Sequence, residues 1–168
     1  MKKSLYLAAF LAWICVMSGG ILSVVNDITA PIIEHNKAQA EAANFAKIFG
    51  EGVSYEAVEF DATGSSIEQI FVAGDIGYAY KVRTYGYQSD IVYIVGVAQD
   101  GSILGFECLE LADTPGFGMK VNEPEYKAVV TSSNIENKVD TISGATVTSK
   151  AIVDTLAEVG AHYAANFK

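Results

Sequence analysis

A hydroxyl-rich segment near the C-terminal end of the chain has the residue types and spacing that would bind an anion. Residues 140–151 read DTISGATVTSKA, and apolar residues at helical spacing follow. The first turn of a helix has free N–H donors and the positive end of the macrodipole, so it binds anions and above all phosphate. Gly144 and Ala145 are small enough to let a phosphate approach the backbone. The segment therefore predicts a phosphate site surrounded by four hydroxyl side chains: Ser143, Thr146, Thr148 and Ser149.

Two other interpretations of this segment compete with that one. A nucleotide P-loop would need a lysine after its last glycine, whereas Ala145 follows Gly144 here. An ordinary helix N-terminus is also crowded with capping serines and threonines. From these residues alone the second interpretation stays open, and it is the commoner case.

Three helices and a sheet are predicted around this segment. An amphipathic helix is predicted over residues 148–166, with four apolar residues on one face: Ile152, Leu156, Val159 and Tyr163. A second helix, rich in Ala, Glu, Lys and Gln, is predicted over residues 34–49. Pro31 marks a point where that helix can begin, and Gly50 provides its stop. A short helix is predicted over residues 126–130.

Between the helices the hydrophobic period changes to that of strands. Alternating or apolar runs predict strands near residues 58–60 and over 67–73, 77–85, 91–98 and 102–111. The run 91–98, IVYIVGVA, suits a strand buried on both faces. Asp100-Gly101 is a two-residue hairpin signal that joins this strand to the next. The pattern predicts an α+β fold with a mainly antiparallel sheet flanked by helices.

The N-terminal end of the chain is apolar enough to cross a membrane. No charged residue lies between Lys3 and Asp27, and a helix of that length, rising about 1.5 Å per residue, spans a hydrocarbon layer of ~30 Å. Two lysines precede the run and the next basic residue is Lys37, which favours a cytoplasmic N-terminus and an extracytoplasmic remainder. We therefore expect an anchor over residues 1–26, a connecting helix over 27–52 and one domain over 53–168.

Cleavable and lipidated signals are the alternatives to a retained anchor. Residues 18–20, SGG, resemble a signal-peptidase site, but the apolar stretch continues through residues 21–25, which favours retention. A lipoprotein signal needs small residues just before its cysteine, whereas Trp13 and Ile14 precede Cys15. The expected location is therefore the cell membrane, with a single membrane pass.

Composition excludes several classes of protein. The 168 residues are 51% apolar and 18% charged, which is the reverse of a disordered chain. Eleven basic and twenty acidic residues give a net charge of −9, so there is no basic stripe for nucleic acid. Two cysteines and two histidines, all far apart in sequence, predict no metal site. His35 and His162 are expected on the surfaces of their helices.

The motif D-x-x-S-G-A-T-x-T-S at residues 140–149 resembles the flavinylation motif of the FMN-binding domain family. That family includes the G subunit of the Rnf complex and the C subunit of the sodium-translocating NADH:quinone reductase. In it, a dedicated flavin transferase joins FMN through a phosphoester bond to the threonine that closes S-G-A-T, which corresponds to Thr146. Residues 86–120 also resemble the family's central stretch, with Asp113 in place of the usual glutamate and Phe117 in place of leucine.

The resemblance implies roles for particular residues. Thr146 would carry covalent FMN, and Asp140 would orient the motif or assist recognition by the transferase, unless it is simply a turn residue before the helix. Tyr87 is a candidate for stacking on the flavin ring. Five residues would surround the phosphate: Ser143, Gly144, Ala145, Val147 and Thr148. Four would form a loop beside the ring, with a core position as the alternative for the aromatic one: Gly116, Phe117, Gly118 and Met119.

The resemblance also implies a function and partners. The chain would be an electron-transfer subunit without turnover of its own, in a membrane-bound ion-translocating oxidoreductase that connects ferredoxin and NAD. Its partners would be other membrane subunits of that complex, the flavin transferase and the membrane itself. One alternative is a flavinylated carrier in another extracytoplasmic electron-transfer chain or a quinone reductase. Another is a membrane-anchored binding module without a redox group.

Overall fold

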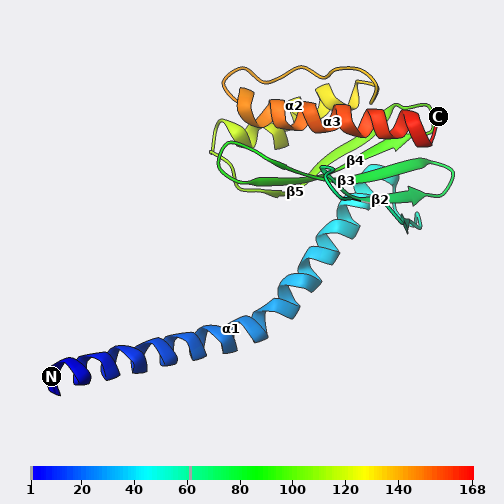
Figure 1. The fold of residues 1–168 in the computed structure, drawn as a ribbon. Coiled ribbons are helices and arrows are strands. Elements are labelled where there is room, and N and C mark those ends of the chain that lie inside the picture. Colours follow the sequence, from blue (N-terminus) through cyan, green and yellow to red (C-terminus); the bar gives the residue numbers. More distant parts are fainter. Residues whose placement is uncertain (1, 61) are drawn as a thin grey trace. The chain divides into compact units, whose positions relative to one another are not determined.

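The computed structural model describes residues 2–60 and 62–168, without the side chains of Lys2 and Leu5, and it contains two compact units. The first unit covers residues 1–40 and the second Glu41–Lys168 (Figure 1). The connecting helix expected over residues 27–52 therefore contributes its last turns to the second unit. Met1 and Asp61, which belong to the predicted anchor and domain, lie outside the described residues.

One long helix, α1 (Lys2–Phe49), supplies the whole of the first unit. Among the described residues it is the one helix long and apolar enough to cross a membrane, and its most apolar window is entirely exposed. These properties are compatible with single-pass anchoring. The helix start expected near Pro31 is wrong, because Pro31 lies inside α1. A proline keeps a helical φ but removes one backbone donor and clashes with the carbonyl four residues earlier, at a cost of about 3 kcal/mol, and α1 continues in spite of this cost.

The second unit is built on a five-stranded antiparallel sheet with the strand order β1-β2-β3-β4-β5. Each strand pairs with the next along the chain, so the sheet is a simple meander. The strands are β1 (Glu56–Val58), β2 (Ile67–Ala73), β3 (Gly77–Tyr85), β4 (Asp90–Ala98) and β5 (Ile103–Leu111). The predicted α+β class is confirmed, and Ile91–Val97 is buried on both faces as expected.

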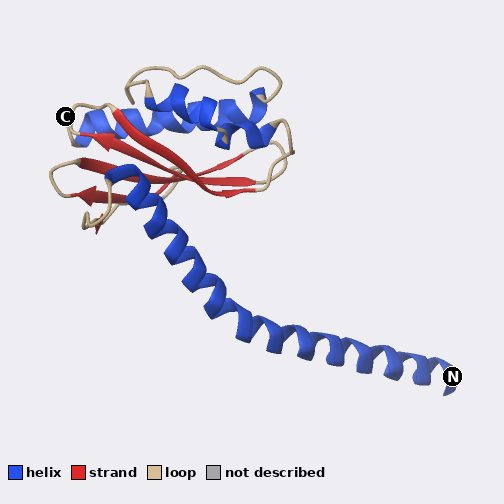
Figure 2. Cartoon of the chain, turned by 180° about the vertical axis from the view of Figure 1, so that it is seen from behind, coloured by secondary structure: helices blue, strands red, loops and turns tan. Residues whose placement is uncertain are grey.

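Helices cover both faces of this sheet (Figure 2). On one face lie η1 (Gly118–Asn122), α2 (Pro124–Thr131) and α3 (Thr146–Asn166). The apolar face predicted for α3 is confirmed, since Ile152, Leu156, Val159 and Tyr163 are buried in the main core with residues of the sheet. His162, expected on the surface of its helix, is half-buried, and its ring packs edge-on against Phe60 and Tyr80. The core therefore fixes the axis of α3, and with it the position of its first turn.

The last turns of α1 pack on the opposite face of the sheet. Phe45 is buried there against Phe71, Ala79 and Ile94. The neighbouring β4 and β5 carry glycines at paired positions, Gly96 and Gly105, directly beneath Ile48. A Cβ added at Gly96 would lie 2.3 Å from Ile48 Cγ2, and one at Gly105 would lie 2.9 Å from Ile48 Cγ1. The glycine pair thus makes the room in which the end of the helix packs.

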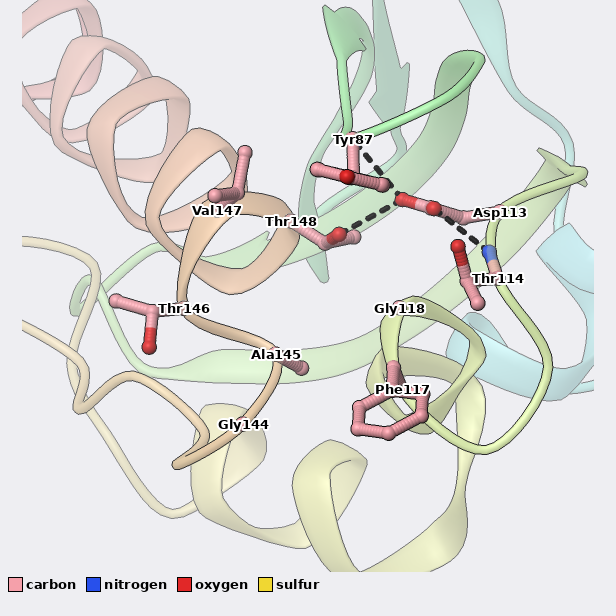
Figure 3. A pocket seen from close by; sticks show the side chains of 10 residues that line it. All are labelled: Tyr87, Asp113, Thr114, Phe117, Gly118, Gly144, Ala145, Thr146, Val147 and Thr148. Atoms are coloured by element: carbon pink, nitrogen blue, oxygen red, sulfur yellow. Dashed lines mark hydrogen bonds between the residues drawn. The ribbon is translucent and has the colours of Figure 1, made fainter.

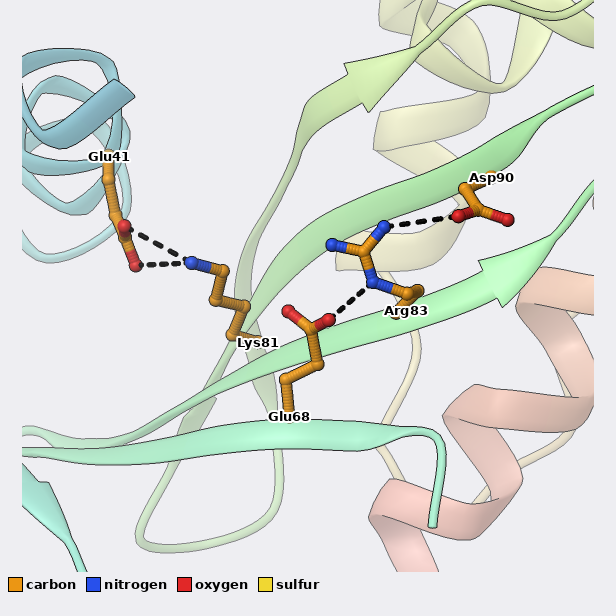
Figure 4. Close-up of polar contacts among 5 residues, drawn as sticks. All are labelled: Glu41, Glu68, Lys81, Arg83 and Asp90. Carbon is orange, nitrogen blue, oxygen red and sulfur yellow. Dashed lines mark hydrogen bonds and ion pairs between the residues drawn. The ribbon is translucent and has the colours of Figure 1, made fainter. Parts of the chain in front are cut away.

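Ion pairs run along the same face of the sheet (Figure 4). Lys81 Nζ lies 3.2 Å from both carboxylate oxygens of Glu41, which is the first residue of the second unit. Arg83 pairs with Glu68 on β2 and, at 3.2 Å, with Asp90 on β4. The Lys81–Glu41 pair is half-buried, whereas the Arg83 pairs are largely exposed, and exposed pairs contribute only about 0–1 kcal/mol each. They therefore help to align neighbouring elements and add little to stability.

Replacing Gly96 by valine is expected to lower the free energy of unfolding by about 1–3 kcal/mol, because the added methyl groups overlap Ile48 and Phe49. Urea unfolding of the full chain in detergent measures this loss. Adding Ile48→Ala to the Gly96→Val chain should restore part of the lost stability, because alanine leaves room for the valine methyl groups. A double variant no more stable than Gly96→Val alone would contradict this packing.

Candidate functional site

A cavity of about 380 Å³ lies where three segments of the second unit meet (Figure 3). The first segment is the turn after β3, the second is the loop between β5 and η1, and the third is the start of α3. Small-molecule sites typically have volumes of about 300–1,000 Å³, so the cavity is large enough for a ligand. Ten residues line it: Tyr87, Asp113, Thr114, Phe117, Gly118, Gly144, Ala145, Thr146, Val147 and Thr148.

The start of α3 lacks a side-chain cap. Its N-cap residue is Ala145, a residue type that provides no capping oxygen. The first helical bond is the one that the Ser149 N–H donates to the Ala145 carbonyl at 2.9 Å. The N–H groups of residues 146–148 therefore have no acceptor within the helix. These donors lie at the positive end of the dipole of a 21-residue helix, so the turn is suited to hold an anion.

The hydroxyl groups expected as caps have other roles. Thr148 is 1% exposed, and its Oγ1 donates to Asp113 Oδ2 at 2.7 Å. Ser149 is fully buried; its Oγ donates to the Ala145 carbonyl at 2.9 Å and accepts from the Ile142 N–H at 3.0 Å. Thr146, by contrast, is exposed and lines the cavity. Of the three hydroxyls in this turn, Thr146 is the one open to a reagent.

Asp113 connects the three walls of the cavity. Its buried carboxylate accepts hydrogen bonds from the Tyr87 N–H at 3.0 Å, the Thr114 N–H at 2.7 Å and Thr148 Oγ1 at 2.7 Å. Burial alone would raise the pKa of this carboxyl, but the hydrogen bonds from Thr148, Tyr87 and Thr114 outweigh it and lower the pKa. Asp113 therefore stays ionised at neutral pH. The sequence shows Asp113 as a departure from the family motif but gives no sign that it belongs to the site.

Acidification is expected to weaken the fold through Asp113. Because folding lowers the pKa of this carboxyl, its contribution is complete above the pKa of an unfolded aspartate, about 3.9, and is lost as the pH falls through the folded pKa. The gap in unfolding free energy between the wild type and Asp113→Asn should therefore be constant near neutral pH and narrow below about pH 4. Urea titrations at a series of pH values measure this gap. A gap that stays constant into strong acid would contradict the assignment.

The other walls combine one unpaired hydroxyl with exposed apolar side chains. Thr114 Oγ1 is buried and has no hydrogen-bond partner among the described residues. Phe117 and Val147 are each 57% exposed although they line the cavity, and Tyr87 is 63% exposed. The core position considered for Phe117 is therefore wrong. Aromatic and aliphatic groups around an unpaired donor are the surroundings that a flat ring with polar edges requires.

Four of the residues expected at the site lie outside the lining of this cavity. Ser143, Gly116 and Met119 are exposed neighbours of lining residues. Asp140 is exposed and lines a separate cavity of about 230 Å³ together with Tyr126 and Ile142. The structure thus brings eight of the expected residues together and adds Asp113 and Thr114. The roles expected for all twelve residues stay predictions.

Comparison with known proteins places this geometry in context. Residues 86–159, which contain every residue that lines the cavity, match the family described as FMN-binding domain. The chain is 27% identical to the G subunit of an ion-translocating oxidoreductase complex from Methanosarcina acetivorans, over 85% of each chain. It is 25% identical to the G subunit of a proton-translocating ferredoxin:NAD(+) oxidoreductase complex from Clostridium ljungdahlii, over 86% of this chain and 83% of that one.

A solved structure has a similar fold. NqrC from Shewanella oneidensis superposes with a TM-score of 0.51 over 67% of this chain and 80% of that one, at 18% identity. Residues 86–159 thus match the FMN-binding domain family, and the chain is similar to the G subunits of ion-translocating oxidoreductase complexes over most of its length.

Proposed function

We propose that this chain carries FMN bound covalently to Thr146 and passes electrons within a membrane-bound, ion-translocating oxidoreductase complex of the Rnf type. The observation that carries the proposal is the exposed Thr146 hydroxyl at the uncapped start of α3, beside a cavity of ligand size. The coupling of ferredoxin to NAD is proposed from the relatives in C. ljungdahlii and Acetobacterium woodii, whose complexes are named ferredoxin:NAD(+) oxidoreductases.

The residues around the cavity fit each part of FMN. The free N–H groups of residues 146–148 would hold the phosphate, and the helix macrodipole would offset its negative charge. Phe117, Val147 and Tyr87 offer apolar surface to the ring, and the unpaired Thr114 Oγ1 offers it a hydrogen bond. The hydroxyl of Thr148 already donates a hydrogen bond to Asp113, so Thr148 would contact the phosphate through its backbone N–H.

A covalent bond suits a cofactor that works outside the cytoplasm. A site without such a bond retains its ligand only as its dissociation constant and the free ligand concentration allow. A phosphoester to Thr146 removes that dependence where no pool of FMN refills the site. The flavin supplies the redox chemistry when bound, whereas the chain supplies position, exclusion of water and electrostatics. No residue of this chain is assigned a catalytic role, so no turnover is expected from the chain alone.

The proposed setting is the outer side of a cell membrane. α1 would anchor the chain, with the lysines before its apolar run in the cytoplasm and the second unit across the membrane. The proposed partners are the other membrane subunits of the complex and a flavin transferase. The transferase would move FMN from a flavin dinucleotide to the Thr146 oxygen, breaking the pyrophosphate bond and releasing a nucleoside monophosphate. The support for the partner subunits is that the relatives in M. acetivorans and C. ljungdahlii are named as subunits of such complexes.

Co-purification tests the complex-level proposal. A tagged full chain is expressed in its native host and extracted in mild detergent. It should co-purify with membrane subunits of an oxidoreductase and carry flavin. Recovery of the flavinylated chain with an extracellular reductase would instead identify it as a carrier in another electron-transfer chain. Recovery without flavin from cells that contain an active transferase would contradict the redox function.

A further inference from the structure

The carboxylate of Asp113 is a buried charge at the cavity that the proposed attachment chemistry does not use. The residue is 3% exposed, and its oxygens accept hydrogen bonds from Tyr87, Thr114 and Thr148 (Figure 3). Tyr87 lies 26 residues before it and Thr148 lies 35 residues after it. One side chain thus joins the turn after β3, the loop before η1 and the first turn of α3.

Backbone encloses the carboxylate on two further sides. A Cβ added at Gly118 would lie 2.4 Å from Asp113 Cγ, and one added at Gly86 would lie 2.6 Å from Asp113 Oδ2. Neither glycine has a positive φ, so the close approach of the carboxylate explains their lack of a side chain. The carboxylate therefore occupies a fitted space, and it cannot shift without moving the walls of the cavity.

The charge of this carboxylate is held by neutral groups. Its three hydrogen-bond donors are two backbone amides and one hydroxyl. They satisfy the oxygens without cancelling the charge, and the lowered pKa keeps the group ionised. A fixed negative charge in a poorly hydrated place acts on its neighbours more strongly than one in water does. Such a charge on the cavity wall opposes the addition of electrons to a group bound there.

We propose that Asp113 is a positioning residue that fixes the first turn of α3 against the other two walls and lowers the reduction potential of the flavin bound beside it. The second part rests on the proposed function, whereas the first concerns the chain itself. The inference separates the two roles by residue: Thr148 takes part in the positioning alone, and Asp113 supplies both the hydrogen-bond acceptors and the charge.

Two variants test the two contributions. Asp113→Asn keeps the shape but removes the charge and replaces one acceptor oxygen by an NH2 donor, whereas Thr148→Val keeps the charge and removes one donor, so it measures the loss of a hydrogen bond by itself. In the flavinylated full chain, Asp113→Asn should raise the equilibrium constant for reduction by about tenfold, which is an upward shift of about 30 mV for a two-electron couple. Thr148→Val should shift the reduction potential much less. Thr148→Ser should have the wild-type potential, because serine keeps the hydroxyl donor. Spectroelectrochemical titration of each variant measures these shifts.

Hydrogen exchange tests the positioning role without any flavin. In the unmodified full chain, Asp113→Asn and Thr148→Val should both accelerate amide exchange by about tenfold in residues 86–90, 113–118 and 146–150, because local opening becomes easier. Exchange in β2, which contains none of the three residues that donate hydrogen bonds to Asp113, serves as the internal control. Thr148→Val keeps the test decisive even where Asp113→Asn fails to fold.

Each outcome decides one part of the inference. Unchanged exchange at these segments in both variants would overturn the positioning role, whether or not the wild type carries flavin. An unchanged potential in Asp113→Asn, or an equal shift in Thr148→Val, would overturn the electrostatic role. A wild-type chain that never acquires flavin would contradict the proposed function and, with it, the electrostatic role, whereas the exchange result would still decide the positioning role.

Discussion

The Thr146→Val variant, produced together with an active flavin transferase, is expected to carry no flavin after denaturation. Valine has nearly the shape of threonine but no hydroxyl, so no phosphoester can form. The loss should be complete, because the other hydroxyls of this turn are buried and hydrogen-bonded at Thr148 and Ser149. In-gel fluorescence after boiling in detergent measures the covalently bound flavin, and urea unfolding should show nearly wild-type stability.

Two matched variants make this result specific. Thr146→Ser keeps a hydroxyl at the same position and should retain some covalent flavin. Ser149→Ala removes a neighbouring hydroxyl and should keep the flavin, provided that the chain folds. Fluorescence that persists in Thr146→Val, or that disappears in Ser149→Ala while the fold remains intact, would place the attachment at another residue.

Gly144→Ala is expected to slow flavin attachment by about tenfold, because a side chain at this position strains the backbone by roughly 1–2 kcal/mol. Gly144 has a φ of +83°, in the left-handed region that favours glycine, and it lines the cavity beside Thr146. An added Cβ would meet no atom within 4 Å, so the effect comes from the backbone conformation. The rate of flavin incorporation into the purified chain, with transferase in excess, measures it.

Gly64→Ala is the control for this backbone effect. Gly64 has a similar φ of +79° and also has open space around it, but it does not line the cavity. Both variants should lose a similar amount of stability, whereas only Gly144→Ala should be flavinylated slowly. Equal attachment rates in the two variants would mean that the conformation of Gly144 does not matter for the modification.

Local patterns in the sequence are sufficient to predict most of the fold. The alternation of apolar residues in β3, the β-branched run in β4 and the Asp100-Gly101 turn each depend on neighbouring residues alone. Such patterns do not predict the continuity of α1 through Pro31, because a proline costs about 3 kcal/mol in a helix interior and therefore signals a helix start or stop. The aromatic packing of His162 escapes them because its partners, Phe60 and Tyr80, are distant in sequence.

The site is predictable only in part, for the same reason. The S-G-A-T segment is continuous, so the helix start and the position of Thr146 follow from its residues. The partners of Asp113 come from three separate segments, and the unpaired Thr114 Oγ1 is visible only once the loop is folded. Capping propensity points to serine and threonine, whereas Ala145 occupies the N-cap. The absence of a capping side chain there leaves donors free for a phosphate.

Fragmentation mass spectrometry of one tryptic peptide reports directly on covalent FMN at Thr146. Trypsin cleaves after Lys138 and after Lys150, so it releases the motif of residues 140–149 within the single peptide 139–150 from the chain made with its transferase. We predict that this peptide carries the mass of one FMN less one water, with the fragment ions placing the addition on Thr146. An unmodified peptide, or an addition on any other hydroxyl of the segment, would contradict the account.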